Sequence, residues 1–323
     1  SPQCVFWNFS LFDRLGGWDN EGCEVTGFVN ETVTCNCNHL TSFSILMSPF
    51  SFNNPALDYI TYIGVGISMA SLVICLIIEG IIWNNISRNN TSYLRHVSIV
   101  NIAVSLLIAN IWFIIGAAIS DAEETNVSAC IAATFFIHFF YLAMFSWMLC
   151  MSVMLVHQLI FVFTPLRKRV FMFFSSIIGY VCPILIVGCS YVYSKYTGKP
   201  YFDPNVCWLV YEKLLEGSIH AFFIPIGTII FINLFSMMVV IITLTKTSVP
   251  ENSKTHDKDT AKSVLKVVVF LTPVFGITWI FGFAQLILEE GTLLTVAYYT
   301  FTILNSFQGL FILLTGCFTE QKV

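Results

Sequence analysis

Long apolar stretches alternate with short polar segments along most of the chain. A helix needs about 20 mostly apolar residues to cross the hydrocarbon core of a bilayer. Each such stretch must be helical, because a lone strand cannot satisfy its backbone hydrogen bonds in lipid. Seven stretches are long enough, namely 57–83, 94–119, 130–163, 170–193, 217–245, 261–288 and 293–317. The pattern therefore predicts an all-α membrane protein whose residues 57–317 form a seven-transmembrane helix bundle.

The composition agrees with this prediction. Hydrophobic residues make up 56% of the chain and charged residues only 11%, and the mean hydropathy is +0.79. Soluble domains carry about 25% charged residues, so we expect membrane lipid to cover most of the helix bundle. The net charge is −4, and no dense run of lysine and arginine occurs. A nucleic-acid partner is therefore not expected.

The basic residues orient the helices across the membrane, because lysine and arginine concentrate on the cytoplasmic side. One side carries only Arg14, Lys195, Lys199 and Lys213. The loops after the first, third and fifth stretches and the tail at 318–323 carry the others: Arg88, Arg95, Arg167, Lys168, Arg169, Lys246, Lys254, Lys258, Lys262, Lys266 and Lys322. We therefore expect an extracellular N-terminus and a cytoplasmic C-terminus. The opening Ser1-Pro2-Gln3-Cys4 lacks the regions of a signal peptide, so we also expect the chain to be part of a longer protein.

The cysteines fall into two groups. Those on the predicted outer side lie where disulfides persist, and Cys130 at the outer end of the third helix can meet Cys207 in the second outer loop. Spacing alone leaves three pairings open for the four cysteines of the outer segment. A metal site is the alternative there, but too few other ligands lie nearby, so we expect neither a metal nor a cofactor. Thiols in the apolar stretches are expected to be free and buried, namely those of Cys75, Cys150, Cys182, Cys189 and Cys317. Two sequons on the outer side, at Asn8 and Asn30, are candidates for glycosylation.

The tripeptide His39-Leu40-Thr41 contains the groups for one self-cleavage reaction. The Thr41 hydroxyl is a nucleophile, and His39 can act as its base. Attack on the Leu40 carbonyl carbon would give an ester, which water would then hydrolyse to leave two chains. A lone His-x-Thr is usually only a turn, and we expect no catalytic turnover.

The segment that follows, 41–50, is apolar although it lies outside the predicted membrane spans. Phe43, Ile45 and Met47 alternate as in a buried strand. Phe43, Leu46 and Met47 also fall close to helical spacing, as in a short helix that binds in a groove. Periodicity alone favours an ordinary core strand followed by a linker.

The outer segment resembles the proteolysis-site motif that ends the autoproteolysis-inducing domain of adhesion G-protein-coupled receptors. The resemblance rests on the order Cys4-x-x-Trp7, Trp18, Cys23, Cys35-x-Cys37 and His39-Leu40-Thr41. It implies that residues 1–40 are the disulfide-linked last strands of that domain, with Cys4 paired to Cys35 and Cys23 to Cys37. It also implies cleavage between Leu40 and Thr41, with the chain's own N-terminal extracellular fragment as a partner.

The same resemblance assigns residues 41–56 to a tethered agonist and its linker. Phe43, Leu46 and Met47 are then its main apolar anchors, with Ile45 in support. The run Thr-Ser-Phe-Ser-Ile-Leu-Met-Ser-Pro at 41–49 resembles the sixth subgroup, or F branch, of these receptors.

Residues of the helix bundle extend the resemblance over essentially the whole chain. Pro273-x-x-Gly276-x-x-Trp279 predicts a kink in the sixth helix, with Trp279 as a switch residue that the agonist touches. A packing aromatic beside a static kink is the alternative. Phe301, Asn305, Gln308 and Gly309 belong to the seventh helix, where Gln-Gly marks a bend in the family, and an intramembrane amide needs a partner. The family also places an aromatic lid at Trp208, after Cys207.

The third helix departs from the family. Relatives usually carry Trp-Met-x-x-Glu-Gly there, whereas this chain has Met151 and Ser152 at the last two positions.

These features together predict a plasma-membrane receptor. We expect its tethered agonist to enter the outer pocket and a heterotrimeric G protein to bind the cytoplasmic face, with an unknown extracellular ligand as the trigger. Two other readings remain: a secretin-like receptor activated by a soluble peptide, and an adhesion scaffold with little signalling. The spans show neither paired charges nor inverted repeats, which argues against a transporter or channel.

Overall fold

The computed structural model describes residues 6–8, 17–19, 23–29, 32–37, 55–86, 90–120, 126–161, 166–211, 217–247, 271–287 and 292–317. His39, Leu40, Thr41 and the agonist anchors Phe43, Ile45, Leu46 and Met47 lie outside these ranges, as do Cys4 and Asn30. The predictions made for those residues therefore stay predictions.

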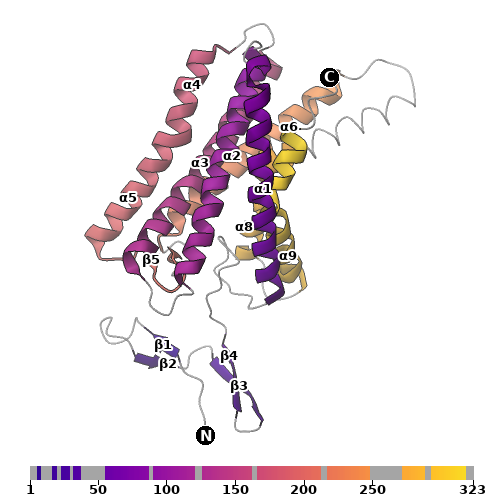
Figure 1. The fold of residues 1–323 in the computed structure, drawn as a ribbon. Coiled ribbons are helices and arrows are strands. Elements are labelled where there is room, and N and C mark those ends of the chain that lie inside the picture. Colours follow the sequence, from indigo (N-terminus) through magenta and orange to yellow (C-terminus); the bar gives the residue numbers. More distant parts are fainter. Residues whose placement is uncertain are drawn as a thin grey trace.

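The described part of the chain is mostly helical, and long helices run side by side (Figure 1). The first three are α1 (Pro55–Ile86), α2 (Asn90–Ser120) and α3 (Val127–Ile160). The fourth span consists of α4 (Lys168–Ser176), the π-helix η1 (Ile177–Val181) and α5 (Cys182–Thr197). It is followed by α6 (His220–Thr247). These boundaries differ from the predicted ones by a few residues at each end.

The last two predicted spans are broken helices. The sixth, predicted at 261–288, is described from Leu271 onward and includes η2 (Ile277–Trp279) and α8 (Ile280–Ile287). The seventh consists of α9 (Thr292–Ser306), α10 (Gln308–Ile312) and η3 (Leu313–Cys317). Within the described residues, five helices are long and apolar enough to cross a membrane. The pair Leu293–Ser306 and Gln308–Gly316, bent by 58°, makes a sixth such span.

Two antiparallel hairpins precede the helices. β1 (Phe6–Asn8) pairs with β2 (Gly17–Asp19), so that Trp7 lies opposite Trp18. β3 (Cys23–Val29) pairs with β4 (Thr32–Cys37) and places Cys23 opposite Cys37. Residues that face each other in an antiparallel pair have Cα atoms about 4.5–5.5 Å apart, within the range that a disulfide spans. The register is thus compatible with the predicted Cys23–Cys37 bridge.

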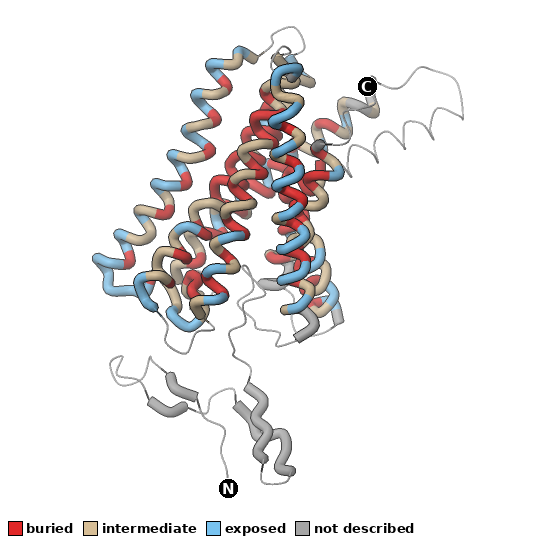
Figure 2. The backbone as a smooth tube through the Cα atoms, in the orientation of Figure 1, coloured by how far each residue is buried: buried red, intermediate tan, exposed pale blue. Residues whose placement is uncertain are grey.

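The core of the bundle is centred on α3. In its most apolar window, 67% of the residues are buried, compared with 28% in the fourth span and 33% in α1. Figure 2 shows this difference in burial. Buried positions predominate along the central helices, whereas buried and exposed positions alternate along α1 and the fourth span. A membrane helix with one exposed apolar side places that side against lipid, so the exposed isoleucines of α1 need no protein partner.

The predicted free thiols require two corrections. Cys75 is disulfide-bonded. Cys150 is free and buried as expected, whereas Cys182 and Cys189 are free but exposed on the fourth span. This span contributes one narrow side to the core, so its other residues face outward.

Candidate functional site

A pocket with a largely apolar lining opens among the helices of the bundle. Four helices and the break in the sixth span contribute to it. It is lined by Thr61 and Val65 of α1, Asn110 and Phe113 of α2, Tyr141 of α3, Trp279 of η2, and Phe301, Thr302, Asn305 and Ser306 of α9. The predicted residues Trp279, Phe301 and Asn305 thus meet in one pocket, although they come from different spans. Concave sites with an apolar lining and a few convergent polar groups are candidate ligand sites.

Trp279 joins the aromatic side chains of this pocket. Its ring lies 5.6 Å from that of Tyr141, 5.0 Å from that of Phe145 and 5.6 Å from that of Phe301, the last two edge to face. Such pairs add about 0.5–1.5 kcal/mol each beyond the area they bury. Trp279 is only 2% exposed. Its position therefore depends on three neighbouring rings, which belong to α3 and α9.

The polar side of the pocket is only partly hydrogen-bonded. The Tyr141 hydroxyl donates to Asn110 Oδ1 (3.1 Å), and Thr278 donates to Asn305 Oδ1 (2.9 Å). The Asn305 amide nitrogen donates to the Phe301 carbonyl oxygen. Thr302 Oγ1 is buried and has no hydrogen-bond partner among the described residues. A buried hydroxyl without a partner costs about 1–3 kcal/mol, so a polar group that enters the pocket would be favoured at Thr302.

The sixth span is broken just before Trp279. The Gly276 N–H donates to the Pro273 carbonyl oxygen, and the Trp279 N–H donates to the Gly276 carbonyl oxygen, each three residues back. In a continuous α-helix the Trp279 N–H would instead reach Phe275, four residues back. The break therefore leaves the Phe275 carbonyl oxygen available to a side chain, and the Pro273 oxygen can accept a second bond beside the one from Gly276.

Amides from two neighbouring helices bind these carbonyl oxygens. Gln308 of α10 donates through Nε2 to the Pro273 oxygen (3.3 Å) and accepts through Oε1 from the Trp279 indole N–H (3.0 Å). Asn233 of α6 donates through Nδ2 to the Phe275 oxygen (2.9 Å). Buried carbonyls are almost always paired, and here the side-chain amides replace the missing helical bonds. Gln308 connects the pocket residue Trp279 directly to the break.

Gly276 occupies a position that only glycine fits well. Its φ is 68°, in the left-handed region, where residues with a Cβ are strained. An added Cβ would also lie 2.8 Å from Phe145 Cε1 and 2.9 Å from Met148 Sδ. The backbone conformation and the crowding therefore both require glycine here.

Replacing Gly276 with alanine is expected to destabilise the protein and to disturb the pocket. The strained φ alone costs about 1–2 kcal/mol, and the shift of Phe145 would disturb Trp279. The matched control is Gly188→Ala, because a Cβ at Gly188 meets nothing within 4 Å. The melting temperature of the purified protein in detergent should fall by about 5 °C in Gly276→Ala and stay within about 1 °C in the control. Equal melting temperatures would contradict this account of the break.

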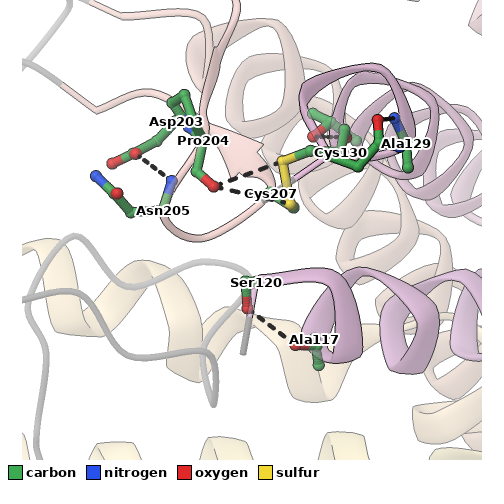
Figure 3. The surroundings of a disulfide bond; sticks show 10 residues. Ala117, Ser120, Ala129, Cys130, Asp203, Pro204, Asn205 and Cys207 are labelled. Atoms are coloured by element: carbon green, nitrogen blue, oxygen red, sulfur yellow. Dashed lines mark hydrogen bonds between the residues drawn. A yellow bond between two sulfur atoms is a disulfide. The ribbon is translucent and has the colours of Figure 1, made fainter. Parts of the chain in front are cut away.

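The loop between α5 and α6 is fixed at one end of the bundle by a disulfide. Figure 3 shows Cys130 at the start of α3 bonded to Cys207, with the Pro204 carbonyl oxygen beside both sulfur atoms. In the same loop the Asn205 N–H donates to Asp203 Oδ1 (2.9 Å), which tightens the turn between β5 (Phe202–Asp203) and β6 (Trp208–Leu209). The predicted pair of cysteines therefore lies together.

His138 of α3 anchors the same loop from inside the bundle. Its Nδ1 is 3.1 Å from the Tyr201 hydroxyl, and its Nε2 is 3.3 Å from the Ala221 carbonyl oxygen. The carbonyl can only accept, so Nε2 carries the proton and Nδ1 accepts from Tyr201. Burial raises the pKa of Tyr201, which keeps its hydroxyl a neutral donor. This intramembrane histidine is thus a hydrogen-bonded packing residue.

Trp208 does not line the cavity. It is buried against Phe222 of α6, with ring centroids 5.2 Å apart, and Phe222 in turn lies edge to face with Tyr141. Gly309 also lies outside the pocket, and its N–H donates to Ser68 Oγ (2.9 Å) where α10 meets α1. A Cβ at Gly309 would overlap the Ser68 side chain, so this glycine permits the bend at Phe307.

Sequence reasoning missed several residues of the site. Asn110, Tyr141 and Thr302 line the pocket, and Asn233 binds the broken helix, yet none was singled out. The available signal was an isolated polar residue within an apolar stretch, which needs a partner in the membrane. That rule indicates which residues are bonded but not the helix that supplies the partner.

Two family profiles match the chain. The profile described as 7 transmembrane receptor (Secretin family) matches residues 54–312. The profile described as GAIN subdomain B matches residues 1–51.

Curated receptors match the chain over nearly its full length. Adhesion G protein-coupled receptor F5 of Rattus norvegicus is 44% identical over 331 residues, which cover 100% of this chain and 24% of that receptor. Adhesion G-protein coupled receptor F1 of Homo sapiens is 39% identical over 324 residues, with 100% and 34% coverage. Adhesion G protein-coupled receptor F4 of Homo sapiens is 41% identical over 325 residues, with 99% and 45% coverage. The chain thus spans less than half the length of these relatives.

Proposed function

This chain belongs to the F branch of the adhesion G-protein-coupled receptors, and from that premise we propose that its own segment at about 41–50 activates it. The segment acts as a tethered agonist that enters the pocket around Trp279. The observation that carries this proposal is the connection from the pocket to the broken helix. Trp279 lines the cavity and donates to Gln308, which holds the Pro273 carbonyl.

The pocket fits the chemistry of the segment. Phe43 and Met47 would contact the aromatic rings of Trp279, Tyr141 and Phe301, since sulfur and aromatic groups both bind favourably to aromatic rings. The free Thr302 hydroxyl would bind a polar group of the segment, and a serine precedes and follows Phe43. The segment thus offers polar groups beside its apolar anchors.

The tether makes modest contacts sufficient. Linking the agonist to the bundle raises its effective concentration to the millimolar range for a short flexible linker. The occupied pocket then favours the bundle conformation to which the agonist binds more tightly, and only the difference in affinity between conformations shifts the equilibrium. Contacts with Trp279 would give such a difference in affinity if the indole changes position when the sixth span breaks or straightens.

The remaining assignments follow from the same premise. The receptor lies in the plasma membrane with its N-terminus extracellular, and a heterotrimeric G protein binds the cytoplasmic face. Its own N-terminal fragment, released by cleavage between Leu40 and Thr41, covers the agonist until an extracellular ligand removes it. Cys4–Cys35 and Cys23–Cys37 bridges hold that region, and Asn8 and Asn30 carry glycans.

G-protein activation by membranes that contain the receptor tests this proposal. A Phe43→Ala/Met47→Ala variant is compared with the unmodified receptor at matched surface expression, and Ser48→Ala is the control within the same segment. We expect the double variant to lose at least about 90% of the agonist-driven activity, because two buried anchors contribute roughly 1.5–3 kcal/mol each.

A synthetic peptide spanning residues 41–50 should restore the activity of the double variant, whereas a scrambled peptide of the same composition should not. If the double variant signals as well as the unmodified receptor, the segment is only a structural strand and the activating ligand binds elsewhere. If a soluble hormone activates a receptor that lacks residues 41–50, the secretin-like alternative holds.

A further inference from the structure

A hydrogen-bonded relay leads from α3 to the broken helix without entering the pocket. Ser152 Oγ lies 2.6 Å from Asn233 Oδ1 of α6, and Asn233 Nδ2 lies 2.9 Å from the Phe275 carbonyl oxygen. Ser152 and Asn233 are both 0% exposed. Neither residue lines the cavity, so any role in signalling must act through the break.

The partners fix the direction of each bond in the relay. The Phe275 carbonyl can only accept, so the Asn233 amide must present Nδ2 to it. Oδ1 then faces Ser152, which must donate. Ser152 Oγ is also 2.9 Å from the Leu149 carbonyl oxygen of its own helix, but its single hydrogen is shared between these acceptors. Without the hydroxyl, Asn233 Oδ1 would be a buried acceptor with no partner among the described residues, and the amide would lose its fixed orientation.

The relay favours the broken form of the sixth span over a continuous helix. In a continuous helix the Trp279 N–H would bond to the Phe275 oxygen and would compete there with Asn233 Nδ2. In the observed form the Trp279 N–H bonds to Gly276 instead, and Asn233 satisfies Phe275. The bond from Asn233 to Phe275 is thus unopposed when the helix is broken and weakened when it straightens.

We propose that Ser152 is a positioning residue for signalling. It orients Asn233 so that the amide holds the Phe275 carbonyl and stabilises the break that carries Trp279. The inference rests on the proposed function, because it treats the broken form as the signalling form. Ser152 contacts no ligand, so it acts only through the conformational equilibrium, which changes the constitutive activity and the response to the agonist together.

Variants of the intact receptor test this role. Ser152→Ala removes the hydroxyl, and Ser152→Thr retains it. Ser236→Ala is the matched control, because the buried Ser236 hydroxyl bonds only the Ile232 carbonyl of its own helix. Constitutive G-protein activation is measured for each at matched surface expression, together with the maximum and the half-maximal concentration of the response to the 41–50 peptide.

Ser152→Ala should lower constitutive activation and the peptide maximum about fivefold or more, the effect of leaving one buried acceptor unpaired. The half-maximal peptide concentration should rise as well, because fewer receptors are in the form that binds the agonist tightly. Ser152→Thr should recover most of the activity, and Ser236→Ala should match the unmodified receptor. The Ser152→Ala/Asn233→Ala variant should activate the G protein as well as Asn233→Ala alone, because both substitutions interrupt the same hydrogen-bonded relay.

Equal activity of Ser152→Ala and Ser236→Ala would overturn the proposal, and so would additive losses in the Ser152→Ala/Asn233→Ala variant. A shift in peptide potency with unchanged constitutive activation would also overturn it. If the peptide is inert but Ser152→Ala still lowers constitutive activation, the tethered agonist is refuted and the relay stands. If no variant signals at all, both fail.

Discussion

Trp279→Ala is expected to abolish activation by the tethered agonist and to raise the peptide concentration for half-maximal response about 100-fold. The indole is 2% exposed and contacts the rings of Tyr141, Phe145 and Phe301. Truncating a buried tryptophan costs about 3–5 kcal/mol. The truncation also removes the hydrogen bond to Gln308 (3.0 Å), which connects the pocket to the Pro273 carbonyl.

Trp279→Phe separates the two contributions of the indole. A phenyl ring keeps most aromatic contacts but cannot donate to Gln308, so we expect a peptide potency between those of the unmodified receptor and Trp279→Ala. Trp112→Ala is the matched control, because Trp112 stacks on Phe136 at 4.7 Å and does not line the cavity. The measurement is a peptide dose–response at matched surface expression. Equal losses in Trp112→Ala and Trp279→Ala would mean that general destabilisation, and not the pocket, limits signalling.

The helical spans and the break in the sixth span are the features of this receptor that could be predicted from local sequence. An apolar stretch of about 20 residues has only one stable form in lipid, so the described helices follow the predicted spans closely. The Pro273 and Gly276 pair likewise determines the break locally, because proline removes a donor and glycine tolerates the positive φ of 68°.

The partners of the buried polar groups could not be predicted in the same way. An amide such as that of Asn233 or Gln308 needs a bond in the membrane, but its partner depends on how helices far apart in sequence are packed. Trp208 illustrates the same limit. The family pattern placed it over the pocket, whereas it lies against Phe222, because the Cys130–Cys207 bond and the His138–Tyr201 contact fix the path of its loop.

Glu79 is a further buried polar group whose partner depends on helix packing, and its pair is the subject of the second prediction with a large expected effect. Glu79 of α1 is buried against His96 of α2, with His96 Nδ1 at 2.8 Å and 3.0 Å from its two carboxylate oxygens. Each residue is 1% exposed. A carboxylate buried this deeply is stable only with a charged or hydrogen-bonding partner.

Removing one member of the Glu79–His96 pair is expected to cost about 3–5 kcal/mol, because the other member stays buried without its closest partner. His96→Leu should therefore lower the melting temperature of the purified receptor in detergent by about 5–10 °C. Glu79→Gln should cost less, since an amide still bonds the imidazole. Glu79→Leu/His96→Leu should recover more than half of the loss, because an apolar pair of similar volume leaves no buried charge. A double variant whose loss equals the sum of the single losses would show that the two residues do not interact, and that the tie between α1 and α2 depends on other contacts of each residue.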